Sequence, residues 1–148
     1  MTLLVAVAVV STGVAVSQKT DRDTASSEDK KTFEAVCGTC HTSDMVNEIR
    51  TKDDWNATVH EMAKIGAKGT DEQFERVRRY LLRNWTKVNV NTAPALDIAA
   101  VLDVSDATAE AIVKRRNAKG DFKTLDDLKA VPGVDPVKLA ARKDRIAF

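Results

Sequence analysis

The densest group of reactive side chains lies at residues 36–42, V-C-G-T-C-H-T, which include both cysteines, Cys37 and Cys40, and one of the two histidines, His41. Such a group can be a redox pair, part of a zinc site or the attachment point of a haem. A thioredoxin-type redox pair lies in a βαβ pattern, which this sequence lacks. A structural zinc site needs four ligands, and only His60 remains to complete one.

The order Cys-x-x-Cys-His favours haem. Cys37 and Cys40 lie about one helical turn apart, so each can form a thioether with a vinyl group on one edge of a porphyrin. His41 follows at the point where its imidazole can bind the iron. A disulfide between the two cysteines is the alternative, but it would close too small a loop to stabilise the chain much. The sequence therefore predicts one covalently bound haem c.

A haem iron takes a second axial ligand or keeps that position open for a substrate. The candidate ligands are Met45, His60 and Met62. Met45 follows His41 by only four residues, and its chain would have to pass around the porphyrin edge to reach the opposite face. We therefore expect the ligand to come from the helix that contains the other two residues.

That helix, expected near residues 52–65, separates His60 from Met62. Its apolar face contains, at spacings of four and three residues, Trp55, Val59, Met62 and Ile65. His60 points about 140° away from Trp55, toward water. We predict Met62 as the second iron ligand, and the alternative is a plain core methionine on an apolar stripe.

The elements that position these residues are predicted to be helices. Capping-box spacing, which marks helix starts, occurs at Ser26 with Asp29, Thr51 with Asp54, and Thr70 with Gln73. The apolar periodicity predicts helices near residues 27–37, 52–65, 71–84, 93–101, 106–118, 125–130 and 136–144. No alternating strand pattern of useful length appears, so the predicted fold class is all-α.

The N-terminal residues, MTLLVAVAVVSTGVAVSQ, are uncharged and mostly apolar. They are fewer than the roughly 20 apolar residues of a spanning helix. Residues 1–17 fit a secretory signal peptide without a basic n-region, and an uncleaved membrane anchor or a buried N-terminal helix are the alternatives. The polar residues 18–27 are expected to be a flexible tether. The two leading interpretations place the rest of the chain in the periplasm, outside the cell or at the cell surface.

The first half resembles a known family. After Cys-x-x-Cys-His, the chain has a W-x-x-x-V-x-x-M-x-x-x-G-A segment at residues 55–67 and then Tyr80 with Leu81. Over roughly residues 28–85 it is similar to the small class I monohaem cytochromes c and the cytochrome subunits of periplasmic dehydrogenases. The resemblance implies that His41 and Met62 are the axial ligands. It also implies that the first helix, with Phe33, packs across the third, with Phe74, Val77 and Tyr80.

The second half resembles a different family. Matching segments are V-N-x-N-T-A at residues 88–93, Ala109-x-x-Ile112, Gly120-x-Phe122, Leu125-x-x-Leu128 and Val131-Pro132-Gly133-Val134. Over residues 87–146 the chain is similar to the tandem helix-hairpin-helix module of competence-type DNA receptors. The resemblance implies two helical hairpins, which can bind either a nucleic acid or a protein.

Two features argue against DNA binding by this half. DNA-binding members have a Gly-h-Gly turn in each hairpin, whereas this chain has Asp103-Val104-Ser105 and Gly133-Val134-Asp135, which place acidic groups where a phosphate would lie. From Val88 onward, ten basic residues are offset by nine acidic ones, so no strong positive field results. The run Lys114-Arg115-Arg116 can contact phosphate or an acidic protein, or it can be a solvated helix end.

Together these patterns predict an exported electron-transfer protein, with a monohaem cytochrome c domain at residues 28–86 and a helix-hairpin-helix docking domain at residues 87–148. The expected partner is a periplasmic or cell-surface redox protein. The net charge of +1 gives no bulk attraction to nucleic acid or acidic lipid, and any membrane contact would come through an N-terminal anchor. Self-assembly of copies is left open.

We expect a carrier and not an enzyme, because the sequence contains no arrangement of a nucleophile, a base and an orienting group. Two other functions remain as alternatives. One is a DNA-binding surface protein in which the haem is structural. The other is a haem enzyme or gas sensor with an open sixth position on the iron.

Overall fold

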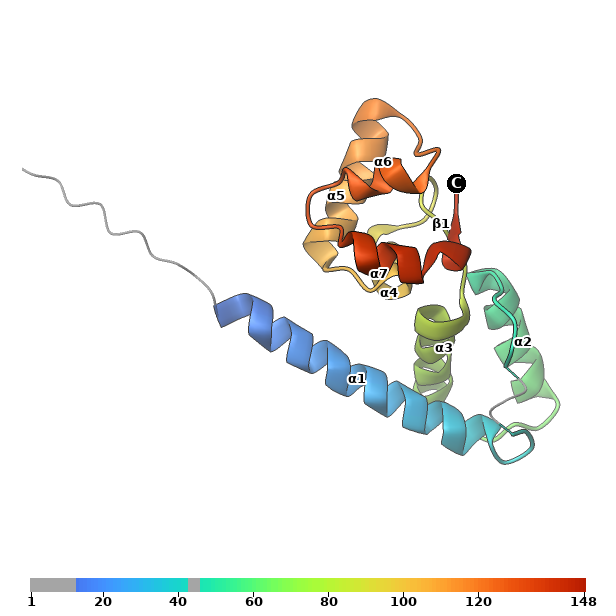
Figure 1. Cartoon of the computed structure of the whole chain (residues 1–148). Coiled ribbons are helices and arrows are strands. Elements are labelled where there is room, and N and C mark those ends of the chain that lie inside the picture. Colours follow the sequence, from blue (N-terminus) through green and yellow to red (C-terminus); the bar gives the residue numbers. More distant parts are fainter. Residues whose placement is uncertain (1–12, 43–45) are drawn as a thin grey trace, which may run out of the picture.

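The computed structural model describes residues 13–42 and 46–148, and the chain within them is mostly helical (Figure 1). The predicted all-α class is confirmed, apart from two strands of two residues each in this part of the chain. No helix of these residues is long and apolar enough to cross a membrane. The elements are, in order, α1 (Gly13–Cys37), α2 (Lys52–Lys64), α3 (Asp71–Trp85), β1 (Val88–Asn89), α4 (Ala95–Leu102), α5 (Asp106–Lys119), α6 (Leu125–Lys129), α7 (Pro136–Ala141), the 3₁₀ helix η2 (Lys143–Arg145) and β2 (Ile146–Ala147).

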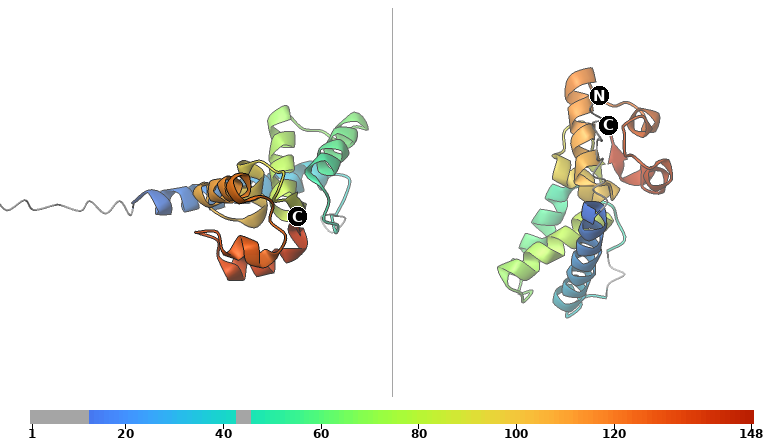
Figure 2. Two further views of the ribbon diagram at one scale, coloured as in Figure 1. Left: turned by 90° about the horizontal axis from the view of Figure 1, so that it is seen from above. Right: turned by 90° about the vertical axis from the view of Figure 1, so that its left-hand side faces the viewer.

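Helices α1, α2 and α3 form the first half of the molecule. The C-terminal half of α1 crosses α3 (Figure 1, Figure 2). Their buried side chains form one apolar cluster of Phe33, Val36, Trp55, Val59, Val77 and Leu81. The rings of Phe33 and Tyr80 stack with their centroids 4.5 Å apart. The expected packing of the first helix across the third is therefore confirmed.

Helix α1 is longer than the sequence indicates. A flexible tether is predicted at residues 18–27, but the structure has helical backbone from Gly13 to Cys37. No other glycine and no proline interrupts this range, and a helix with one packed end extends at little cost per residue. The tether prediction is wrong for this reason. The predicted signal peptide or anchor, residues 1–17, lies largely outside the described residues.

Asp29 shows why no helix begins at the predicted Ser26–Asp29 capping box. Its side chain is 1% exposed, and its carboxylate accepts hydrogen bonds from Arg79 at 2.9 Å and Arg83 at 2.5 Å, both on α3. A buried carboxylate requires such partners. Asp29 therefore fixes α1 against α3 and does not cap a helix start.

The other two predicted capping boxes are confirmed. Thr51 with Asp54 begins α2, and Thr70 with Gln73 begins α3. The hydrogen bonds from Thr51 hold the pKa of the Asp54 carboxyl below its usual value. Gly66, with φ of 114°, follows α2 in a conformation that glycine adopts readily, so the chain turns there before α3.

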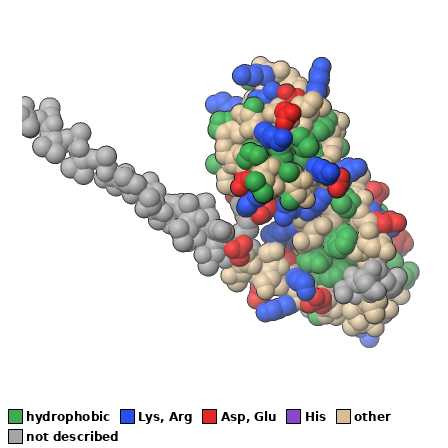
Figure 3. All heavy atoms as spheres, in the orientation of Figure 1, with side chains coloured by type: hydrophobic (Ala, Val, Ile, Leu, Met, Phe, Trp, Pro, Cys, Tyr) green, Lys and Arg blue, Asp and Glu red, His purple; other side chains and the backbone are tan. Residues whose placement is uncertain are grey.

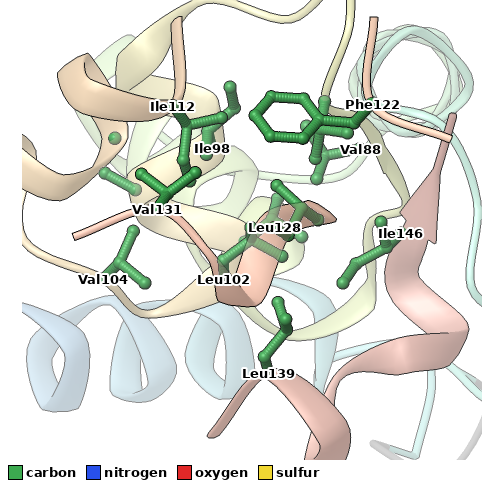
Figure 4. Packing of buried hydrophobic residues seen from close by; sticks show 14 residues of the cluster. Val88, Ile98, Leu102, Val104, Ile112, Phe122, Leu128, Val131, Leu139 and Ile146 are labelled. Atoms are coloured by element: carbon green, nitrogen blue, oxygen red, sulfur yellow. The ribbon is translucent and has the colours of Figure 1, made fainter. Parts of the chain in front are cut away.

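Helices α4 to α7 form a second lobe around its own apolar cluster, shown in Figure 4. The largest fully buried side chains of this cluster include Phe122, Ile98, Leu102, Ile112 and Leu128. The boundaries of α4, α5 and α6 agree with the predicted ranges within about two residues. The predicted positions of these three helices are therefore confirmed.

The end of the chain differs from the prediction. A helix is predicted over residues 136–144, but α7 ends at Ala141, and β2 follows after the short η2. Strand β2 pairs in parallel with β1, with Val88 opposite Ile146. Because the two strands come from the start and the end of the second lobe, their pairing closes it and requires extended backbone there.

The two lobes are joined by specific contacts. The Arg145 guanidinium donates to the carbonyls of Thr86 and Leu82, each at 3.0 Å. Lys52 on α2 forms an ion pair with Asp97 on α4 at 2.8 Å. Burial lowers the pKa of Arg145 to about 10, so the side chain still has its charge at neutral pH. On the face of the molecule drawn in Figure 3, lysine and arginine side chains gather where the two lobes meet.

Candidate functional site

A cavity of about 660 Å³ lies between the end of α1, the turn that follows it, α2 and α3. Both cysteines line it, together with His41 and Met62. The four residues that the sequence singles out for one cofactor are therefore brought to one cavity, although Met62 lies on a different helix from the cysteines. This convergence is the geometric basis of the candidate site.

The cysteines lie in a turn that ends α1. The N–H groups of His41 and Cys40 donate to the Cys37 carbonyl at 3.1 Å and 3.3 Å. The Thr39 hydroxyl donates to the Val36 carbonyl at 3.0 Å. Cys37 is half-buried, Cys40 is exposed, and neither is joined in a disulfide. The turn thus places both thiols at the cavity wall, with His41 next to them.

The thiol environment differs from that of a redox pair. Burial raises the pKa of the Cys37 thiol, which keeps it protonated at neutral pH. Redox cysteines act as thiolates, in surroundings that lower the pKa. His60, which a zinc site would need, is exposed and does not line the cavity.

The α2 helix presents its candidate ligands as the sequence predicts. Met62 is half-buried and lines the cavity on the same face as the buried Trp55 and Val59. His60 faces solvent. Met45, the third candidate, lies outside the described residues. The packing direction of Met62 is therefore confirmed, and its bond to an iron stays a prediction.

The remaining lining suits a large, flat, apolar cofactor. It includes the apolar side chains of Phe33, Val36, Val46, Ile65, Phe74 and Val77. Ile65 faces the cavity although it is 75% exposed, and apolar surface of this kind gains free energy when a ligand covers it. One imidazole and one thioether form the axial pair of many cytochromes c. The residues present thus fit a haem c.

Arg50 also lines the cavity, although its position in the sequence does not single it out. Its guanidinium carbon lies 5.1 Å from the centre of the Trp55 ring, and its Nη2 lies 2.9 Å from a Glu48 carboxylate oxygen. A basic residue directly before the Thr51 helix cap was the available signal. It was too common a pattern to indicate a site.

In the hairpin turns of the second lobe, side chains of the chain itself accept hydrogen bonds from the first backbone N–H groups of the next helix. Asp103 has φ of 54°, a conformation that glycine adopts most easily. Ser105 accepts a hydrogen bond from the Thr108 N–H at 3.1 Å. Asp135 accepts one from the Val137 N–H at 2.8 Å. The N–H groups of Thr108 and Val137 are thus capped within the chain, and Asp135 adds a negative charge to its turn.

The basic run at residues 114–116 is partly structural. Arg116 donates to the carbonyls of Val90 and Ala93 at 2.7 Å and 2.8 Å. Arg115 lies over an aromatic ring of the lobe's core, 4.4 Å from its centre, while Lys114 is exposed. The interpretation of the run as a solvated helix end is therefore wrong for the two arginines.

Two comparisons with known proteins give matches, and the family match falls in the second lobe. A family model described as a helix-hairpin-helix motif matches residues 83–147. The chain is also 38% identical over 63 residues to an uncharacterized protein of Haemophilus influenzae, and this match covers 42% of the chain and 56% of that relative. The match thus spans little more than half the length of the relative. No solved structure matches this chain. Residues 83–147 therefore carry a helix-hairpin-helix motif.

Proposed function

We propose that residues 28–86 are a c-type cytochrome domain that carries single electrons and that residues 87–148 dock a protein partner. The observation that supports the first part is the convergence of the two cysteines, His41 and Met62 on one cavity. The order Cys-x-x-Cys-His supports it independently. The second part is supported by the hairpin turns, whose backbone N–H groups at Thr108 and Val137 are capped by side chains of the chain itself.

Four residues of the cavity have defined tasks in this proposal. Cys37 and Cys40 would hold the porphyrin through thioethers, and His41 and Met62 would be the protein ligands of the iron. The group held there would supply an iron that can change between ferric and ferrous states and so carry one electron. The apolar lining excludes water from the metal. A thioether from Met62 also raises the reduction potential relative to a pair of histidines.

The proposed setting is the periplasm or the cell surface. The apolar N-terminal stretch supports export. The electron donor and acceptor are then redox proteins of the same compartment. We propose a carrier and not an enzyme, because the sequence contains no nucleophile with a base and an orienting group.

A redox titration of the full-length protein tests this function. The absorption change should follow one reversible one-electron step, with the same midpoint on reduction and on oxidation. The reduced wild-type protein should not bind carbon monoxide, since Met62 fills the sixth position. Binding of carbon monoxide by the wild type would contradict the carrier and favour an enzyme or gas sensor.

A DNA-binding protein with a structural haem is the second candidate. The family match over residues 83–147 favours it, because it concerns the half of the chain that resembles DNA receptors. Two observations oppose it. The hairpin turns carry carboxylates at Asp103 and Asp135, where the DNA-binding proteins that this half resembles have glycine, and Arg116 is engaged with backbone carbonyls of its own lobe.

Fluorescence anisotropy of labelled duplex DNA, titrated with the full-length protein at about 0.15 M salt, separates the two candidates. We expect no binding at micromolar protein concentration. Lys114→Ala is the informative variant, because Lys114 is exposed, whereas changing Arg116 would disturb the fold. Micromolar binding that Lys114→Ala weakens would favour the DNA-binding candidate.

A further inference from the structure

Six basic side chains lie where the two lobes meet, and we call them the junction cluster: Lys52, Arg78, Arg79, Arg83, Arg142 and Arg145. The first four come from α2 and α3, and the last two come from the end of the second lobe. Arg142 donates to the Arg83 carbonyl at 3.4 Å, and Arg145 donates to the Leu82 carbonyl at 3.0 Å. These contacts bring cations of both lobes together.

The junction cluster has fewer acidic partners than cations. Its ion pairs join Lys52 to Asp97, Arg78 to Glu75, and both Arg79 and Arg83 to the single carboxylate of Asp29. Within residues 13–42 and 46–148, Arg142 and Arg145 have no acidic partner and donate to backbone carbonyls. Burial, and then the nearby charge of Arg142, lower the pKa of Arg145 to about 10. Six cations are thus paired with three carboxylates.

A hollow of about 350 Å³ between α2 and α3 opens beside the junction cluster. Three of the cations line it, Lys52, Arg78 and Arg79. The Arg79 side chain is 45% exposed, that of Arg83 is 23% exposed, and Arg142 is half-buried. Because most of these cations are recessed, a protruding side chain reaches them more easily than a flat surface does.

The junction cluster is separate from the cavity of the candidate cofactor site. None of its six residues lines that cavity. On α3, the cavity residues Val77 and Leu81 are each followed two positions later by a cation, Arg79 and Arg83. Two positions correspond to about 200° around a helix. A ligand of the junction cluster would therefore bind on the other side of α3.

We infer that the junction cluster binds aspartate and glutamate side chains of an acidic partner protein, which docks across both lobes. The inference rests on the proposed docking function and names its surface and the chemistry of the partner. The excess of cations supports it through charge complementarity. A guanidinium fork pairs with a carboxylate through two hydrogen bonds. Backbone carbonyls already hold Arg142, so its ordering costs less on binding.

Fluorescence anisotropy of a labelled peptide rich in aspartate and glutamate, titrated with the full-length protein, tests this surface. The wild type should bind the peptide at about 0.1 M salt and much more weakly at about 1 M, because the screening length falls from roughly 10 Å to roughly 3 Å. Arg79→Gln and Arg142→Gln should each weaken the binding about fivefold or more, since each removes a charged donor to carboxylates.

Lys129→Gln is the matched control. It also removes one positive charge, but from α6, where Lys129 pairs with Asp126, so it should bind the peptide as the wild type does. Arg79→Gln leaves Arg83 paired with Asp29, so the fold should persist even if Arg142→Gln disturbs the contact between the lobes. The inference is overturned if the wild type does not bind the peptide at the lower salt, or if Lys129→Gln weakens binding as much as Arg79→Gln does.

Two further titrations test the class of partner. Vesicles of phosphatidylglycerol and phosphatidylcholine present phosphate on a flat surface, and duplex DNA presents it on a rod. Binding to either should be the same for Arg79→Gln and the wild type. If Arg79→Gln and Arg142→Gln weaken binding to vesicles or DNA and leave peptide binding unchanged, the acidic protein is the wrong partner. The haem spectrum of the same samples reports the proposed carrier function separately, because peptide binding does not require the haem.

Discussion

Replacing Met62 with alanine is expected to abolish the sulfur-to-iron absorption band of the oxidised protein and to let carbon monoxide bind the reduced protein. The Met62 thioether occupies the sixth position in the proposed site, and alanine has no donor atom. Because Met62 lies on α2, away from the cysteine turn, the haem should stay attached. Absorption spectra of the full-length variant, with and without carbon monoxide, measure both effects.

His60→Ala is the matched control for this prediction. His60 lies on the same helix but is exposed and does not line the cavity. Its spectrum and its response to carbon monoxide should equal those of the wild type. A high-spin spectrum for His60→Ala, with Met62→Ala unchanged, would show that the helical-face argument selects the wrong residue.

Replacing Gly133 with alanine is expected to lower the free energy of unfolding by roughly 2–4 kcal/mol. Gly133 has φ of 87°, which an L side chain rarely adopts. The added Cβ would lie 2.5 Å from Thr108 Oγ1. Thr108 is buried, and its hydroxyl shares a hydrogen bond with Ser105, so it cannot move away freely. Urea unfolding of the full-length protein measures the change.

A double-mutant cycle isolates the steric part of this loss. Thr108→Ala removes the hydroxyl that the new methyl group would meet. The double variant should therefore lose less stability than the two single variants added together. Full additivity would contradict the close contact between the second hairpin turn and α5.

Helix starts with local signals could be predicted from the sequence. The boxes at Thr51 and Thr70 lie within four consecutive residues each, so the signal for α2 and α3 is complete in the local sequence. Asp29 shows the limit of this reasoning. Its spacing from Ser26 also fits a box, but two arginines of α3, far along the chain, pair with it. Such tertiary pairing overrides the local pattern.

The candidate site could be predicted where chemistry fixes the spacing. The two cysteines and His41 are adjacent in sequence, and Met62 follows from the helical period of α2. Arg50 and Arg116 could not be assigned in this way. Their contacts depend on backbone carbonyls or rings that come together only in the folded chain. A single basic residue in the sequence contains no information on such partners.

Acid–acetone extraction of the purified full-length protein, expressed with a haem-attachment system, tests the central claim most directly. We predict that the red colour stays with the polypeptide, because Cys37 and Cys40 hold the haem by thioether bonds. Changing both cysteines to alanine should release it. Free haem in the acetone phase from the wild-type protein, or a colourless protein that contains zinc, would contradict a c-type cytochrome.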